Sequence, residues 1–248
     1  MVVLRIAGRQ FECEMAAFDM TGTLMDVKAR TSSRARLRAQ TLAELAGEEA
    51  VRHWAKLSGV DTGTWDVDDD GPLAKAPRRE DLIVGATALY LAGHGWQEAK
   101  ELAKKAYDEA DRQLPSFYRP TLFEGAEDAL RRLKEAGLKL AIATNDRRAD
   151  AETSFRVAGV LPLFDAVVGA DEVENPKPSP EMIQLVCERC STEPGNAIYF
   201  GDQPTDILAG RAAGVKAVVA VCYGSEPTPE ISELADIVIA SFGEIEVL

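Results

Sequence analysis

The chain has 248 residues, 46% of them hydrophobic, and a formal net charge of −13 at neutral pH. This composition suits a globular protein, built as one large domain or as a core with an insertion. The negative charge would repel a phosphate backbone, which excludes nucleic acid as the expected partner, and no apolar run is long enough to cross a membrane. The first residues lack a basic segment followed by an apolar one, so we expect no secretory signal. We expect a cytoplasmic protein with reduced cysteines, either a monomer or a homodimer.

The first residues predict a β-hairpin that leads into a buried strand. Residues 2–6 and 11–15 flank a turn, and the apolar residues of the second segment alternate with glutamates. The next apolar run ends at Asp19, after which Gly22 allows a sharp turn. An aspartate at the carboxyl end of a buried strand is well placed for chemistry, and backbone N–H groups of the turn at Gly22 can hold an anion. Alternatively, the aspartate only caps the turn.

Residues 26–118 predict a helical segment with few strand signals. We expect four helices in this segment. The first runs from a hydroxyl N-cap at residues 31–33 to residue 47, and the other three cover residues 48–57, 77–91 and 97–114. Arg34, Arg36 and Arg38 crowd the first turns of the first helix, where positive charge opposes the helix dipole. These arginines form either a solvated charged face or contacts to a substrate carboxylate or second phosphate.

Residues 119–248 alternate between helices and strands. The predicted helices are 126–136, 148–158, 180–190, 205–213 and 229–234, and the predicted strands are 138–143, 164–168, 197–200, 215–221 and 237–240. Nearly continuous apolar strands that alternate with helices indicate a parallel sheet covered on both faces. The predicted fold class is therefore α/β.

Four polar residues fall at or just beyond the ends of these strands: Asp19, Thr144, Lys177 and Asp202. The carboxyl ends of parallel strands share one edge of the sheet, so these side chains can converge. Two nearby carboxylates repel each other unless a cation lies between them, and oxygen ligands favour Mg²⁺. Together with Lys177, the ion would give the site the positive charge that suits a phosphoryl group.

In these residues the sequence resembles the haloacid dehalogenase superfamily, whose members are mostly phosphatases. The four motifs of that family occur in order as Asp19-Met20-Thr21-Gly22-Thr23-Leu24, Thr144, Lys177 and Gly201-Asp202-Gln203-Pro204-Thr205-Asp206. The resemblance covers residues 11–221 and implies a Rossmann-like, doubly wound parallel sheet. The catalytic core would comprise residues 1–25 and 119–248, and residues 26–118 would form an inserted α-helical cap domain.

The resemblance also implies how the reaction would begin. Asp19 would be the nucleophile that becomes an aspartyl-phosphate. Mg²⁺ would be held by Asp19, the backbone carbonyl of Thr21 and Asp202, with Asp206 in support.

A second group of residues would bind the small phosphorylated substrate. By the resemblance, Thr144 and Lys177 would hold phosphate oxygens, and Lys177 would also neutralise charge. Asn145 lies next to Thr144 and could reach the phosphate, as could the turn at Gly22. Residues of the cap would select the substrate.

Position 21 departs from the family pattern. The family's phosphatases carry a second aspartate there, which protonates the leaving group and later activates water. A threonine hydroxyl can do neither at neutral pH, so Thr21 cannot replace this aspartate. We therefore expect a slow phosphatase, and Asp146 or a cap residue is the next candidate for acid and base if turnover is efficient. Two alternatives remain: a phosphonatase-type C–P hydrolase that uses Lys56 or Lys75 of the cap as a Schiff base, and a phosphate-binding regulatory protein with little turnover.

Overall fold

The computed structural model describes residues 1–68, 70–76, 78–117, 119–223 and 226–248. The chain divides into two compact units, Met1–Asp26 with Pro120–Leu248, and Val27–Arg119. That each unit is a separate domain remains a prediction. Among the described helices, none is both long and apolar enough to span a bilayer.

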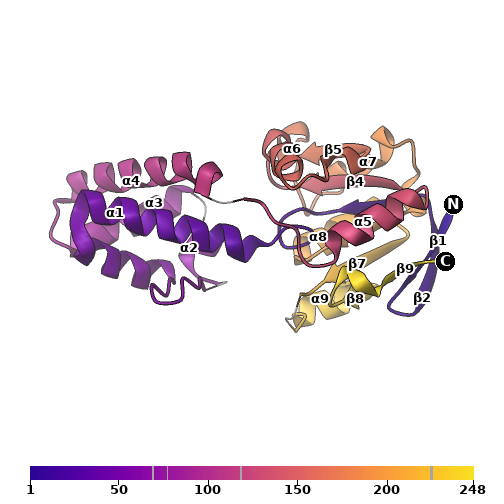
Figure 1. The fold of residues 1–248 in the computed structure, drawn as a ribbon, viewed down its shortest axis with the longest axis horizontal. Coiled ribbons are helices and arrows are strands. Elements are labelled where there is room, and N and C mark those ends of the chain that lie inside the picture. The colour runs from indigo at the N-terminus through magenta and orange to yellow at the C-terminus, as the bar shows by residue number, and fades with distance from the viewer. Residues whose placement is uncertain (69, 77, 118, 224–225) are drawn as a thin grey trace. The chain divides into compact units, whose positions relative to one another are not determined.

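The first unit is built on a six-stranded parallel sheet (Figure 1). The strands lie in the order β5-β4-β3-β6-β7-β8. Their bounds are β3 (Met15–Phe18), β4 (Lys139–Thr144), β5 (Ala166–Gly169), β6 (Ala197–Gly201), β7 (Ala217–Val221) and β8 (Ile237–Ile239). Numbered within this sheet, the order is 3-2-1-4-5-6, which is the order of a Rossmann fold, and it reverses between β3 and β6. The predicted α/β fold with a doubly wound parallel sheet is confirmed.

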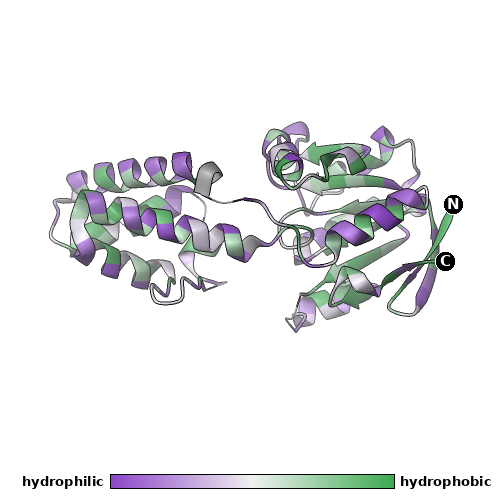
Figure 2. Cartoon of the chain, viewed as in Figure 1, coloured by the Kyte–Doolittle hydropathy of each residue, from purple (hydrophilic) through white to green (hydrophobic). Residues whose placement is uncertain are grey.

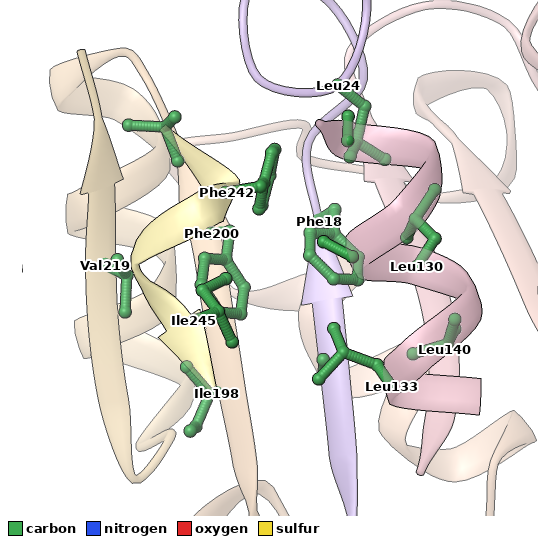
Figure 3. Packing of buried hydrophobic residues seen from close by; sticks show 14 of the residues in the cluster. Phe18, Leu24, Leu130, Leu133, Leu140, Ile198, Phe200, Val219, Phe242 and Ile245 are labelled. Carbon is green, nitrogen blue, oxygen red and sulfur yellow. The ribbon is translucent and has the colours of Figure 1, made fainter. Parts of the chain in front are cut away.

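Helices cover both faces of this sheet. Because side chains alternate along a strand, Phe18 and Phe200 pack in one cluster with α5 and α6, whereas Ala17 and Tyr199 pack in another with α7, α8 and α9. The bounds are α5 (Ala126–Glu135), α6 (Arg148–Val157), α7 (Glu181–Arg189), α8 (Pro204–Ala213) and α9 (Pro229–Leu234), with short 3₁₀ helices η1 (Leu161–Leu163), η2 (Ala170–Glu172), η3 (Pro194–Asn196) and η4 (Phe242–Glu244). Figure 2 shows the strands in green, at the hydrophobic end of the scale, and Figure 3 shows the first cluster between sheet and helix.

A small antiparallel sheet lies beside the first cluster. The predicted hairpin is confirmed, since β1 (Val2–Ile6) pairs with β2 (Arg9–Cys13), but its second strand begins and ends two residues earlier than the predicted 11–15. β1 also pairs with β9 (Ile245–Val247), which was not predicted because three residues are too few to show a strand pattern. The ring of Phe242, just before β9, lies 5.9 Å from the ring of Phe18 (Figure 3), so this segment closes one side of the core.

The second unit is helical. It contains α1 (Val27–Ser58), α2 (Pro72–Lys75), α3 (Arg78–Leu91) and α4 (Trp96–Phe117). α1 breaks at Gly47, whose φ is 82°, and this is where one predicted helix ends and the next begins. The predicted start is wrong: residues 31–33 lie inside α1, because the Lys-Ala-Arg run before them consists of good helix formers. Residue 77, where the third helix was expected to begin, lies outside the described residues.

Arg38 is buried inside this helical unit. Its Nη1 donates to Asp81 Oδ2 at 2.5 Å, and its guanidinium carbon lies 4.0 Å from the centroid of the Tyr107 ring. The hydroxyl of Tyr107 in turn accepts a hydrogen bond from Trp54 Nε1 at 2.7 Å. The ion pair with Asp81 and the stacking on the Tyr107 ring offset the cost of burying the positive charge of Arg38. The expectation of a solvated face is therefore wrong for Arg38, although Arg36 is exposed.

Candidate active site

The predicted site residues lie at the ends of neighbouring strands. Asp19 directly follows β3, Asp202 directly follows β6, and Thr144 is the last residue of β4. β3 pairs in parallel with both β4 and β6, so these ends lie at one edge of the sheet. Asp19 and Asp202 therefore flank the point where the strand order reverses, which is where open α/β sheets bind their ligands.

The ammonium of Lys177 lies among these carboxylates. Its Nζ is 2.6 Å from Asp19 Oδ1 and 2.6 Å from Asp206 Oδ1, and it donates to the carbonyl of Ala143 at 2.9 Å. Lys177, Asp19 and Asp206 expose only 6%, 5% and 2% of their surfaces. Burial alone would lower the pKa of Lys177, but the adjacent charge of Asp19 and the other acidic neighbours hold it well above its ordinary value. Lys177 is therefore a permanent positive charge in the site.

Three carboxylates form an acidic cluster around this ammonium. One oxygen each from Asp19, Asp202 and Asp206 lie within 4.8 Å of one another. Thr23 Oγ1 donates to Asp202 Oδ1 at 2.9 Å, and Gln203 Nε2 donates to Asp202 Oδ2 at 2.7 Å. Side chains from the loops after β3 and β6 thus fix the orientation of Asp202.

The acidic cluster carries more negative charge than Lys177 can balance. Burial raises the pKa of Asp19; Lys177 opposes this, and the charges of Asp206 and Asp202 raise it further. Burial also raises the pKa of Asp202 to about 6, and the charge of Asp206 adds to the effect. A bound cation would remove this repulsion and favour the ionised carboxylates.

Two glycines make room for the aspartates. A Cβ on Gly22 would lie 2.2 Å from Asp202 Oδ2, and a Cβ on Gly201 would lie 2.3 Å from Asp206 Cβ. Gly22 also has a φ of 92°, in the region that other residues avoid. Gly22 therefore allows Asp202 to approach the turn, while its predicted contact with phosphate remains a prediction.

We expect Gly22→Ala to destabilise the protein by about 1–3 kcal/mol more than Gly214→Ala, because the new methyl group must displace the Asp202 carboxylate. Gly214 is a matched control, since its φ is 75° but an added Cβ would meet no described atom within 4 Å apart from its chain neighbours and nearby helix backbone. Urea unfolding of the two variants measures the difference. Equal losses of unfolding free energy in the two variants would show that the Asp202 carboxylate moves aside without destabilising the protein.

Two further residues hold Lys177 in place. Asn145 Nδ2 donates to the backbone carbonyl of Lys177 at 3.3 Å, and Asn145 Oδ1 accepts from the backbone N–H of Lys177 at 3.1 Å. Asn145 thus fixes the Lys177 loop, and its contact with phosphate remains a prediction. The hydroxyl of Tyr199 accepts a hydrogen bond from Lys177 Nζ at 3.1 Å. Tyr199 was not predicted as a site residue, because an aromatic residue in an apolar strand is typical of a core, although a buried hydroxyl needs a partner.

Thr21 and Thr144 both contact Asp146, which lies in the loop after β4. Thr21 Oγ1 donates to Asp146 Oδ2 at 3.0 Å, and the backbone N–H of Asp146 donates to Thr144 Oγ1 at 3.2 Å. Asp146 therefore joins the loop after β3 to the end of β4.

The lysines proposed for a Schiff base belong to the helical unit. Lys56 is an exposed residue of α1, and the side chain of Lys75 lies outside the described part of the structure. A lysine that forms a Schiff base is usually desolvated, so the exposure of Lys56 gives the C–P hydrolase alternative no support.

Comparisons with known proteins agree with this architecture. Phosphoglycolate phosphatase of Salmonella typhi is 28% identical over 240 residues, which cover 92% of this chain and 89% of that protein. The pyrophosphatase PpaX of Bacillus pumilus is 38% identical over 96 residues, 39% of this chain and 44% of PpaX. The chain thus spans about half the length of PpaX, as it does for several other curated relatives that it matches.

A solved structure of similar fold is a HAD-superfamily hydrolase, subfamily IA, from Geobacter sulfurreducens. The two structures superpose with a TM-score of 0.60 at 24% sequence identity, and the match covers 94% of each chain. A family model described as haloacid dehalogenase-like hydrolase matches residues 14–214. That match runs from before Asp19 to beyond Asp206, through every residue of the acidic cluster, and the chain belongs to the haloacid dehalogenase-like hydrolase family.

Proposed function

We propose that the protein is a phosphatase that hydrolyses a small phosphate monoester through an aspartyl-phosphate on Asp19. The supporting observation is the Asp19 carboxylate at the switch point of the sheet, with Oδ1 at 2.6 Å from the Lys177 ammonium. A carboxylate in this position can attack a phosphoryl group while the ammonium offsets charge on the phosphate oxygens. Relatives named as a phosphoglycolate phosphatase and a pyrophosphatase support a small phosphorylated substrate.

We infer that Mg²⁺ is the cofactor. The donor set fits this ion, because the acidic cluster offers only oxygens and has an excess of negative charge. Asp19, Asp202 and the backbone carbonyl of Thr21 would hold the ion, and Asp206 would support the cluster through its ion pair with Lys177. When bound, Mg²⁺ would help to neutralise the charge of the phosphoryl group.

The other side chains would bind and orient the phosphate. The Thr144 hydroxyl and the Lys177 ammonium would donate hydrogen bonds to its oxygens. Thr21 can hydrogen-bond the substrate but supplies no proton at neutral pH. Attack by Asp19 should therefore favour substrates with good leaving groups, and hydrolysis of the aspartyl-phosphate should be slow.

A phosphate-release assay with Mg²⁺ tests this function. The panel would include phosphoglycolate, sugar phosphates, pyrophosphate and p-nitrophenyl phosphate. We expect a burst of p-nitrophenol, followed by slow turnover. Binding of Mg²⁺ and phosphate with neither a burst nor steady release would instead indicate the phosphate-binding regulatory protein.

Asp202→Asn should weaken Mg²⁺ binding by roughly 10- to 100-fold, since it removes an anionic ligand and leaves a neutral amide of the same size. Calorimetric titration with Mg²⁺ measures the change. Asp150→Asn is the control for the loss of one negative charge, because Asp150 is exposed on α6. An unchanged affinity in Asp202→Asn would contradict the metal assignment.

A further inference from the structure

Thr21 and Asp146 form a hydrogen bond for which the proposed function gives no role. Thr21 Oγ1 donates to Asp146 Oδ2 at 3.0 Å, and the two residues are 125 positions apart in the chain. Both residues are half-buried, so they are partly shielded but still accessible to water. Thr21 follows the nucleophile Asp19 by two positions, which places this pair in the loop that carries the reacting carboxylate.

The backbone holds Asp146 in place independently of its carboxylate. The N–H of Asp146 donates to Thr144 Oγ1 at 3.2 Å, and its carbonyl accepts from the N–H of Ala170 at 3.0 Å. The carboxylate is therefore a preorganised acceptor, because forming its bond to Thr21 requires no rearrangement of the loop.

The direction of this hydrogen bond determines what Thr21 can offer. A hydroxyl has one proton and two lone pairs. Because the proton of Thr21 is directed at Asp146, the hydroxyl can offer only its two lone pairs, as an acceptor, to a third group. Without Asp146, the hydroxyl could rotate and direct its proton elsewhere.

We propose that Asp146 is a positioning residue that fixes Thr21 as the hydrogen-bond acceptor for the hydrolytic water. This inference rests on the proposed aspartyl-phosphate. The water oxygen attacks phosphorus, the bond between phosphorus and the Asp19 oxygen breaks, and Asp19 recovers its carboxylate. The proton lost by the water goes to the departing phosphate, so Thr21 and Asp146 keep their protonation states throughout.

The decay of the phosphoenzyme measures this role directly. The protein with Mg²⁺ is labelled with ³²P-acetyl phosphate, chased with unlabelled acetyl phosphate and quenched in acid. Asp146→Ala should slow the decay roughly five- to tenfold, the value of one oriented hydrogen bond, while leaving the rate of labelling near that of the unsubstituted protein. Asp146→Asn should recover most of the loss, because its amide oxygen can still accept from Thr21.

Three further variants separate positioning from other roles. Thr21→Val should decay as slowly as Asp146→Ala, and the double variant should be no slower, because both changes remove the same interaction. Asp150→Ala, which removes an exposed carboxylate from α6, should decay at the unsubstituted rate.

The possible failures can be told apart. If the unsubstituted protein forms no phosphoenzyme, the proposed function fails, and this inference fails with it. If the phosphoenzyme forms but Asp146→Ala decays at the unsubstituted rate, only this inference is overturned. The same holds if Asp146→Asn is as slow as Asp146→Ala, since the charge of Asp146 would then matter rather than its acceptor oxygen.

Discussion

Asp19→Asn should abolish turnover, with a loss on the order of 10⁶-fold, the size of effect found when an enzyme's nucleophile is removed. The amide nitrogen and oxygen of asparagine do not attack phosphorus, so no acyl phosphate can form. Labelling with ³²P-acetyl phosphate should give no acid-stable phosphoenzyme. Phosphate release from p-nitrophenyl phosphate should fall to the background rate.

The same variant should remain folded, which separates lost chemistry from lost structure. Asp19 is one of three carboxylates around Lys177, and the ammonium keeps Asp206 at 2.6 Å when Asp19 is neutral. Lys177 and Asp206 stay paired with each other, so the large penalty for breaking a buried ion pair does not apply to them. Thermal unfolding of Asp19→Asn and of the surface control Asp150→Asn should therefore give similar midpoints. A phosphoenzyme that persists in Asp19→Asn would place the nucleophile elsewhere.

The core of the fold could be predicted because buried parallel strands have a strong sequence signature. β6 and β7 are buried at every position, so they appear in the sequence as short apolar runs between helices. β9 gives no such signal: it has three residues, and its partner β1 lies at the other end of the sequence. Pairing at that separation depends on where the finished core brings the two segments, which local patterns do not encode.

The convergence of polar side chains at the strand ends could be predicted, but their individual contacts could not. Strand ends identify Asp19 and Asp202, because every parallel strand delivers its last residues to the same edge. Contacts such as Thr21 to Asp146 depend on the conformation of two loops that meet only in the folded chain. Arg38 shows the same limit, since its burial depends on Asp81 from a different helix.

Thr21→Asp should speed hydrolysis of the aspartyl-phosphate by about 10²- to 10⁴-fold, the usual contribution of general acid–base catalysis. A carboxylate at this position can take the proton of the attacking water, which Thr21 cannot. However, Thr21 Oγ1 lies 3.0 Å from Asp146 Oδ2, so the new carboxylate would face an existing one. Like charges at that distance repel and raise the pKa of one of them.

The double variant Thr21→Asp with Asp146→Asn should therefore gain more than Thr21→Asp alone. The amide of the new asparagine can donate a hydrogen bond to the introduced carboxylate, which removes the repulsion and orients the base. Thr21→Asn is the size-matched control and should not accelerate the second step, because an amide does not take the proton of water. Phosphoenzyme decay reports the second step, and turnover of alkyl phosphates reports protonation of the leaving group. Fast turnover of an alkyl phosphate by the unsubstituted protein, with no burst, would contradict this account, because another group would then already supply the acid and the base.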